Sequence, residues 1–146
     1  MAEAAHAQWQ VYRGNGHILT EQVLYKRDQR IFPGRSWSYA DVLYTIVGNK
    51  ITTGSMGSEF DLVFTCKNGK LYSGRGMYSS EIAYTFANGK IYKGDSTFPL
   101  DVLYNVKDGV IYTGDQAFTL DAMYVITGTY TDVDIFAILL SLELIS

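Results

Sequence analysis

The stretch Glu81-Ile82-Ala83-Tyr84-Thr85-Phe86-Ala87-Asn88-Gly89-Lys90-Ile91-Tyr92-Lys93-Gly94 decides the fold. Two β-prone runs flank Asn88-Gly89, and Asn-Gly between such runs is the strongest short-range signal for a type I′ hairpin turn. Asn68-Gly69 and Asp108-Gly109 repeat the signal at a spacing of 20 residues. The sequence therefore predicts one antiparallel hairpin in each 20-residue unit.

The repeat runs through nearly the whole chain as two series of tetrapeptides. One series starts with an acidic residue and ends with an aromatic one: Asp41–Tyr44, Asp61–Phe64, Glu81–Tyr84, Asp101–Tyr104 and Asp121–Tyr124. The other ends with glycine: Val11–Gly14, Ile31–Gly34, Ile51–Gly54, Leu71–Gly74, Ile91–Gly94 and Ile111–Gly114. A fixed period indicates a small unit that buries its apolar face against neighbouring copies.

Counting outward from the two-residue turn places residues opposite one another, and opposed residues share a face of the sheet. Phe86 then lies opposite Ile91, and Cys66 opposite Leu71, on a face that we expect to form the core. The other face is mixed and is expected to be partly covered: Ala83, Thr85, Tyr92 and Gly94. The recurrent glycine has two interpretations, a positive φ where the strand leaves the sheet or room for a neighbouring tyrosine ring.

The last apolar run, 133–145, lacks this alternation. Ile135-Phe136-Ala137-Ile138-Leu139-Leu140 is continuous, which we interpret as a strand covered on both faces or lying in a subunit interface. With six strands of each repeating kind, this gives about 13 strands. Pairing of the terminal runs would close a ring and remove its open edges.

We therefore expect an all-β fold of tandem 20-residue hairpins, closed on itself, in one domain spanning 1–146 with atypical segments at about 1–40 and 126–146. A barrel and a trefoil-like arrangement of six hairpins are both compatible with this pattern, and so is a stacked solenoid. A propeller-like grouping of two hairpins per sheet would give three blades, below the usual minimum of four.

The units Asp101-Val102-Leu103-Tyr104, Asn88-Gly89-Lys90 and Ile91-Tyr92-Lys93-Gly94 resemble bacterial tandem-repeat proteins of uncharacterised function. Their units read roughly D-x-L-Y, N/D-G-K and I-Y-x-G. The likeness covers about residues 40–125 and implies hairpins rather than a chemistry. It supplies no functional residues.

Composition narrows the classes of function. The chain has 12 basic and 15 acidic residues, a net charge of −3 and a pI of about 5.2, so it offers no cationic stripe for nucleic acid. Its longest apolar run is about half of the roughly 20 residues that a membrane span needs. One cysteine allows no internal disulfide. The N-terminal sequence lacks a secretory signal, as expected of a cytoplasmic protein or a processed secreted one.

No residue pattern points to catalysis or to a cofactor. The acidic series could form a metal ladder, but a residue that hydrogen-bonds its own turn is the simpler interpretation. His6 and His17 lie at no metal-ligand spacing, and Cys66 is expected to be a buried, inert thiol. No nucleophile-elbow, Walker or zinc-ligand pattern occurs. We therefore predict no catalytic residue, metal site or cofactor.

Aromatic residues outside the core series are the better candidates for a ligand site: Trp37, Arg35, Tyr39, Arg75 and Tyr78, with Trp9 beside them. Flat rings and guanidinium groups bind sugars, peptides and proteins. The alternative is that such rings, Phe98 and Phe118 included, fold back onto the core. We expect a non-catalytic scaffold or protein-interaction module, able to self-associate through 133–145. A carbohydrate-binding module and a hydrolase with a carboxylate pair are the alternatives.

Overall fold

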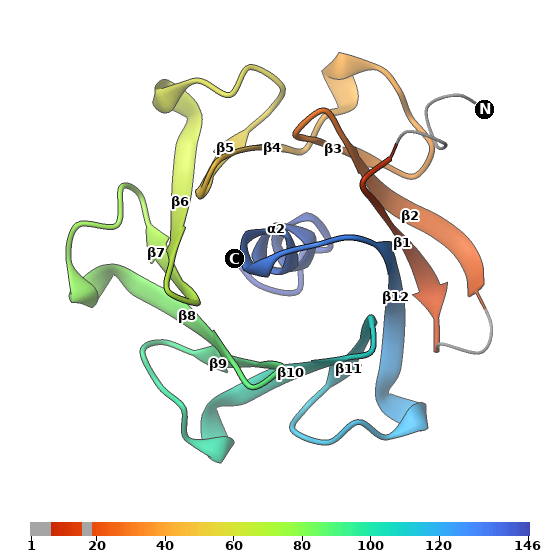
Figure 1. Ribbon diagram of the computed structural model, residues 1–146, viewed down its shortest axis with the longest axis vertical. Coiled ribbons are helices and arrows are strands. Elements are labelled where there is room, and N and C mark those ends of the chain that lie inside the picture. Colours follow the sequence, from red (N-terminus) through yellow and green to blue (C-terminus); the bar gives the residue numbers. More distant parts are fainter. Residues whose placement is uncertain (1–6, 16–18) are drawn as a thin grey trace.

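A computed structural model describes residues 7–15 and 19–146. Twelve antiparallel strands form a closed barrel around a central α-helix (Figure 1). The strands are β1 (Trp9–Gly14), β2 (Leu19–Arg27), β3 (Arg30–Pro33), β4 (Tyr44–Val47), β5 (Lys50–Thr53), β6 (Leu62–Lys67), β7 (Lys70–Ser73), β8 (Ile82–Ala87), β9 (Lys90–Lys93), β10 (Val102–Lys107), β11 (Val110–Thr113) and β12 (Ala122–Gly128). The closed all-β fold of tandem hairpins is thereby confirmed.

The hairpin turns have the predicted geometry. Asn88 and Gly89 have φ angles of 54° and 77°, and two positive φ values in succession define a type I′ turn. The turns at Asn68-Gly69 and Asp108-Gly109 match it closely. Phe86 pairs with Ile91 and Thr85 with Tyr92, so the predicted register and faces are correct.

The recurrent glycine is explained by backbone conformation. Gly74 and Gly94, for example, have φ of 66° and 72°, and a Cβ atom placed on either would meet no atom within 4 Å. The glycine therefore supplies a positive φ at the end of the strand and does not make room for a ring. A threonine holds this corner in three repeats, since the Thr85 hydroxyl donates to the Gly94 carbonyl at 2.8 Å, as Thr45 and Thr65 do to Gly54 and Gly74.

The ring closes through a sixth hairpin that has no turn. β12 pairs with β1, with Ile126 opposite Val11 and Val125 opposite Tyr12. This is the register of Phe86 with Ile91 and of Thr85 with Tyr92, so the two ends of the chain together rebuild one repeat. Closure was predicted, but β12 supplies the partner strand and the run 133–145 does not.

The prediction of a thirteenth strand at 133–145 is wrong, because this run contains the helix α2 (Asp132–Ser141), which fills the barrel. Once β1 and β12 have paired, the lumen offers no free sheet edge. A helix satisfies its own backbone N–H and C=O groups there, whereas a strand could not. A continuous apolar run suits a helix that is buried all round.

The core lies between this helix and the inner face of the ring. Six apolar side chains at one repeat position, each 0% exposed, surround α2: Val11, Ile31, Ile51, Leu71, Ile91 and Ile111. Ile135 to Leu140 pack against them and are at most 4% exposed. These helix residues are therefore not available as the subunit interface that the sequence suggested for 133–145.

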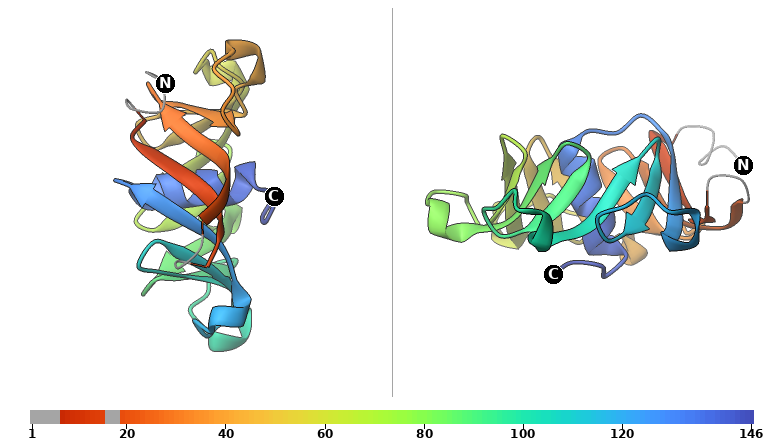
Figure 2. Two further views of the ribbon diagram at one scale, coloured as in Figure 1. Left: turned by 90° about the vertical axis from the view of Figure 1, so that its right-hand side faces the viewer. Right: turned by 90° about the horizontal axis from the view of Figure 1, so that it is seen from below.

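The two faces of the ring differ. Hairpin turns lie toward one face, which we call the turn face, and the chain crosses this face from β12 into α2 (Figure 2). Five connecting segments, which we call links 1 to 5, project outward like petals, and their short helical turns lie toward the opposite face: 34–41, 54–61, 74–81, 94–101 and 114–121. The chain ends on that link face, so the helix spans the ring.

No helix among the described residues is long and apolar enough to cross a membrane.

Candidate functional site

Each link ends in a single 3-10 turn, and the last residue of that turn is the acidic residue of the first tetrapeptide series. The turns are η1 (Tyr39–Asp41), η2 (Glu59–Asp61), η3 (Ser79–Glu81), η4 (Pro99–Asp101) and η5 (Thr119–Asp121). The acidic residue that closes the turn binds its own link in three cases. Ser36 and Ser96 donate to Asp41 and Asp101 at 2.5 Å, and Glu81 accepts from the Tyr78 backbone at 3.0 Å. In links 1, 3 and 4 the acidic residue thus holds its own link together.

The apolar side chains of the links point into solvent. Ten of the twelve exposed large apolar residues in the described chain lie in links 1 to 5, two in each link. They are Trp37, Tyr39, Met56, Phe60, Met77, Tyr78, Phe98, Leu100, Phe118 and Leu120. The expectation that Tyr78, Phe98 and Phe118 fold onto the core is wrong, since they are 64%, 73% and 62% exposed.

Link 1 gathers three of the predicted ligand residues. Arg35, Trp37 and Tyr39 line one open hollow of about 670 Å³. Its wall is braced from behind. The Arg30 guanidinium carbon lies 4.4 Å from the centre of the Tyr39 ring. Phe32 packs against Tyr39 at a tilt and stacks on Tyr25.

The other candidates lie elsewhere. Arg75 and Tyr78 are exposed on link 3, outside this hollow. Trp9 is 1% exposed, and its indole donates to Asp134 at 3.0 Å, so it belongs to the core.

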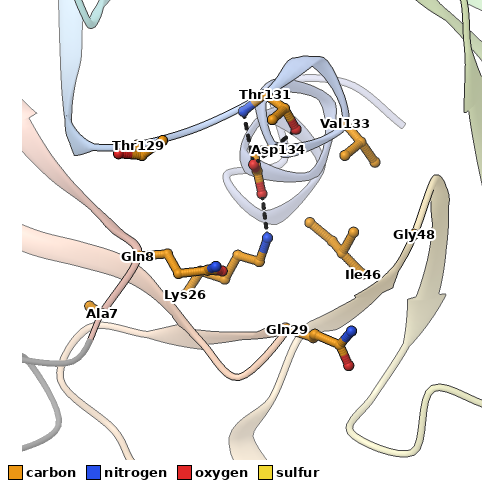
Figure 3. A pocket seen from close by; sticks show the side chains of 10 residues that line it. All are labelled: Ala7, Gln8, Lys26, Gln29, Ile46, Gly48, Thr129, Thr131, Val133 and Asp134. Carbon is orange, nitrogen blue, oxygen red and sulfur yellow. Dashed lines mark hydrogen bonds and ion pairs between the residues drawn. The ribbon is translucent and has the colours of Figure 1, made fainter.

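A second hollow, of about 650 Å³, opens on the turn face beside the start of α2 (Figure 3). We call it the turn-face pocket. Lys26 and Asp134 form its polar floor, with the Lys26 ammonium 2.8 Å from the Asp134 carboxylate. Ile46 and Val133 form an apolar wall, and Gln29 lies at the rim.

Asp134 is the charged centre of this region. Burial raises the pKa of its carboxyl, but hydrogen bonds from Lys26, from Trp9 and from the Thr131 backbone outweigh burial, so the net pKa lies below the ordinary value. The same carboxylate accepts from the Thr131 N–H at 2.9 Å and caps the helix. Asp134 is therefore an anion that holds α2 to β1 and β2.

Tyrosines hold the other end of the helical segment. The Tyr104 hydroxyl donates to the Leu144 carbonyl at 2.9 Å, and burial raises its pKa. Burial likewise raises the pKa of Tyr44, and the charge of Glu143 adds to this effect. These hydroxyls stay protonated and able to donate at neutral pH. The aromatic ends of the first tetrapeptide series thus anchor the C-terminal segment.

The remaining candidates from the sequence are Cys66, the two histidines and the carboxylates. Burial, followed by the charge of Asp132, raises the pKa of the Cys66 thiol to about 11, as expected for a core cysteine. His6 and His17 lie outside the described residues. Within 7–15 and 19–146, no three His, Cys, Asp or Glu side chains cluster to hold a metal. Neither hollow brings two carboxylates together, so the hydrolase alternative gains no support from them.

Sequence reasoning missed Lys26, Gln29 and Asp134. Two of these residues had a signal in the sequence. The spacing Thr-x-x-Asp, from Thr131 to Asp134, is typical of a helix start, and Lys26 is a charged residue directly after the apolar run Val23-Leu24-Tyr25.

A closed ring of hairpins around one helix, with its exposed apolar side chains on outward links, defines a β-repeat scaffold. Residues 11–139 match the model of a family described as 6-fold beta flower protein, and the chain belongs to that family. The match supports the all-β repeat that the resemblance to bacterial repeat proteins implied, without extending to the tetrapeptide motifs themselves. No curated protein and no solved structure matches the chain.

Proposed function

We propose that this protein is an interaction scaffold that binds a partner protein through the apolar residues of its links. The supporting observation is the exposure of Phe60, Leu100 and Leu120, which are 101%, 98% and 97% exposed at the same position of three turns. Single exposed apolar residues are ordinary on protein surfaces. A pair on every link, with few elsewhere, is the pattern of a contact surface.

The charge of the links supports a partner other than a second copy. Links 1 to 5 contain eight acidic and two basic residues. Three of the acidic residues, Glu59, Asp95 and Asp115, pair with lysines of the strands, and the links keep an excess of negative charge. Two link faces brought together would repel one another, whereas a basic surface with apolar side chains would be attracted. An anionic membrane is disfavoured for the same reason.

Sedimentation velocity at low and high protein concentration tests the charge argument. A monomer at both concentrations would agree with the charge argument. A dimer that Leu100→Ser and Leu120→Ser disrupt would show that the links bind a second copy of this chain and not a different protein.

Cross-linking in an extract of the source cells, followed by mass spectrometry, tests for the partner. The triple variant Phe60→Ser/Leu100→Ser/Leu120→Ser should lose a specific cross-linked protein while its thermal midpoint stays unchanged. Val47→Ser is the matched control, since Val47 is exposed but lies outside the links. Cross-links that survive the triple variant would contradict the proposal.

Carbohydrate binding by link 1 is the second candidate, because Arg35, Trp37 and Tyr39 line one hollow. An aromatic face beside a guanidinium group can stack on a sugar and donate hydrogen bonds to its hydroxyls. A glycan array decides it, with Trp37→Ala expected to abolish binding and Phe98→Ala, on another link, expected to leave it intact. Absence of binding to any glycan, or equal binding by both variants, would remove this candidate.

A further inference from the structure

The turn-face pocket lies where the ring departs from its own repeat. Its walls come from the turnless hairpin, through Gln8 and Thr129, and from the turns of the first two hairpins, through Gln29 and Gly48. The three regular Asn-Gly and Asp-Gly turns contribute nothing to it. The pocket therefore occupies the irregular side of an otherwise repetitive face.

At the regular turns the second residue must be glycine because the next strand is too close. A Cβ atom on Gly69 would lie 2.8 Å from the Phe86 carbonyl oxygen, and one on Gly109 would lie 2.7 Å from that of Ile126. The first hairpin has Gln29 at this position. The Gln29 carbonyl still accepts from the Ile46 N–H at 2.8 Å, as the Gly69 carbonyl does from Phe86, so the first turn keeps the backbone contact of the others but carries a side chain.

Gln29 holds this position at a conformational cost. Its φ of 71° lies in the left-handed region, which disfavours residues with a Cβ atom. Asp28 before it is also left-handed, at 51°, but aspartate tolerates that region better. Two successive positive φ values are those of a type I′ turn, so the hairpin itself sets this conformation, and the departure from the repeat is a glutamine where the regular turns have glycine.

The rim carries unused hydrogen-bonding groups. Gln8, Gln29 and Thr129 all line the pocket and are exposed, and their side-chain amides and hydroxyl make no hydrogen bond to another of the described residues. An amide presents a donor and an acceptor side by side and so complements another amide. Ile46 and Val133 offer an apolar surface beside these groups.

The charges of the floor cancel. Lys26 and Asp134 are paired at 2.8 Å, so the pocket presents no net charge to a ligand. An anion would have to compete with Asp134 for Lys26, and a cation would approach the Lys26 ammonium. Either would lose its hydration without gaining a free counter-ion.

We propose that the turn-face pocket binds a small uncharged molecule that carries an amide beside an apolar group. Gln29 and Gln8 pair with the amide, and Ile46 and Val133 contact the apolar group. The volume lies within the usual range of ligand pockets, about 300–1,000 Å³. This site is separate from the link surface, so each can fail without the other.

N-acetyl-leucinamide is a suitable probe, because it has two amides, an apolar side chain and no charge. Titration into ¹⁵N-labelled protein should shift the side-chain amide signals of Gln8 and Gln29 in a saturable way, with a Kd on the order of millimolar for so small a ligand. The salt of N-acetyl-leucine, which carries a carboxylate, should bind more weakly.

Gln29→Gly separates binding from folding. It removes the amide but relieves the positive φ, so the thermal midpoint should rise by a few degrees, about 2–4 °C, while the probe binds at least about fivefold more weakly. Gln116→Ala, which removes an exposed amide on link 5, is the control and should change neither quantity. No shift with the probe at high millimolar concentration, or equal binding by Gln29→Gly and the parent protein, would overturn the proposal.

Discussion

Asp134→Asn should destabilise this protein far more than an ordinary surface substitution. The Asp134 carboxylate accepts hydrogen bonds from the Lys26 ammonium at 2.8 Å and from the Trp9 indole at 3.0 Å, and it also caps α2. The two charged side chains are only 11% and 6% exposed. An asparagine there would leave the Lys26 charge buried without a counter-ion.

Removal of one partner from a buried ion pair typically costs about 3–5 kcal/mol. For a chain of this size, each kcal/mol lowers the thermal midpoint by roughly 2–4 °C, so we expect a fall of about 6–20 °C. Urea unfolding followed by circular dichroism measures the free energy directly. Lys26→Met in the Asp134→Asn background should recover part of the loss, because it removes the unpaired charge.

Acid should reproduce the effect in the parent protein. The pKa of Asp134 is lower in the folded than in the unfolded state, so its contribution is complete above the unfolded value of about 4. It is lost as the pH falls through the lower folded value. The stability difference between the parent protein and Asp134→Asn should therefore shrink toward zero in strong acid.

Asp132→Asn is the matched control, since Asp132 lies in the same helical turn but is exposed. It should cost less than about 1 kcal/mol, the usual size of a charge effect at a helix start. The reasoning fails if Asp134→Asn costs less than about 1 kcal/mol, or if the two substitutions cost the same.

Three further predictions concern the ring and its core. Gly69→Ala should destabilise more than Gly94→Ala, because both have positive φ but only Gly69 would place a Cβ atom against a carbonyl oxygen, at 2.8 Å; equal losses in urea unfolding would contradict this. Cys66 should resist iodoacetamide at pH 8 until denaturant unfolds the chain, because burial raises its pKa to about 11; rapid labelling of the folded protein would refute it. Ile91→Ala should cost about 2–5 kcal/mol, as Ile91 is 0% exposed against α2, and a loss below about 1 kcal/mol would show that the lumen is not packed as described.

The hairpins were predictable because a few neighbouring residues determine each turn. Asn88-Gly89 specifies its turn with two residues, and the turn then fixes which side chains share a face. The positions of Ile91 and Cys66 in the core follow from that register alone. Closure of the ring could also be anticipated, because open sheet edges are a known liability.

The helix could not be distinguished from a strand by pattern. A continuous apolar run such as 135–140 suits either element when it is fully buried. What decides is the space inside the ring, which depends on how many hairpins close it. That number is a property of the whole chain.

The candidate site was predictable only in part. Arg35, Trp37 and Tyr39 were singled out as aromatic and basic residues outside the core series, and they do line one hollow. Trp9 is also an aromatic residue outside the core series, but it lies in the core. Its burial could not be predicted from local pattern, because its hydrogen-bond partner Asp134 is 125 positions away in the sequence. The turn-face pocket depends on contacts between distant segments, and its mark in the repeat is Gln29, which stands where the regular turns have glycine.

The helix in the lumen fixes the number of hairpins that the ring can have. An α-helix with its side chains is about 10–12 Å across, and six inward-facing apolar positions enclose it here. Loss of one hairpin would make the lumen too narrow for the helix, and gain of one hairpin would leave a void beside it. Open repeat arrays can lengthen by duplication one unit at a time. This architecture can change its copy number only together with whatever fills its centre.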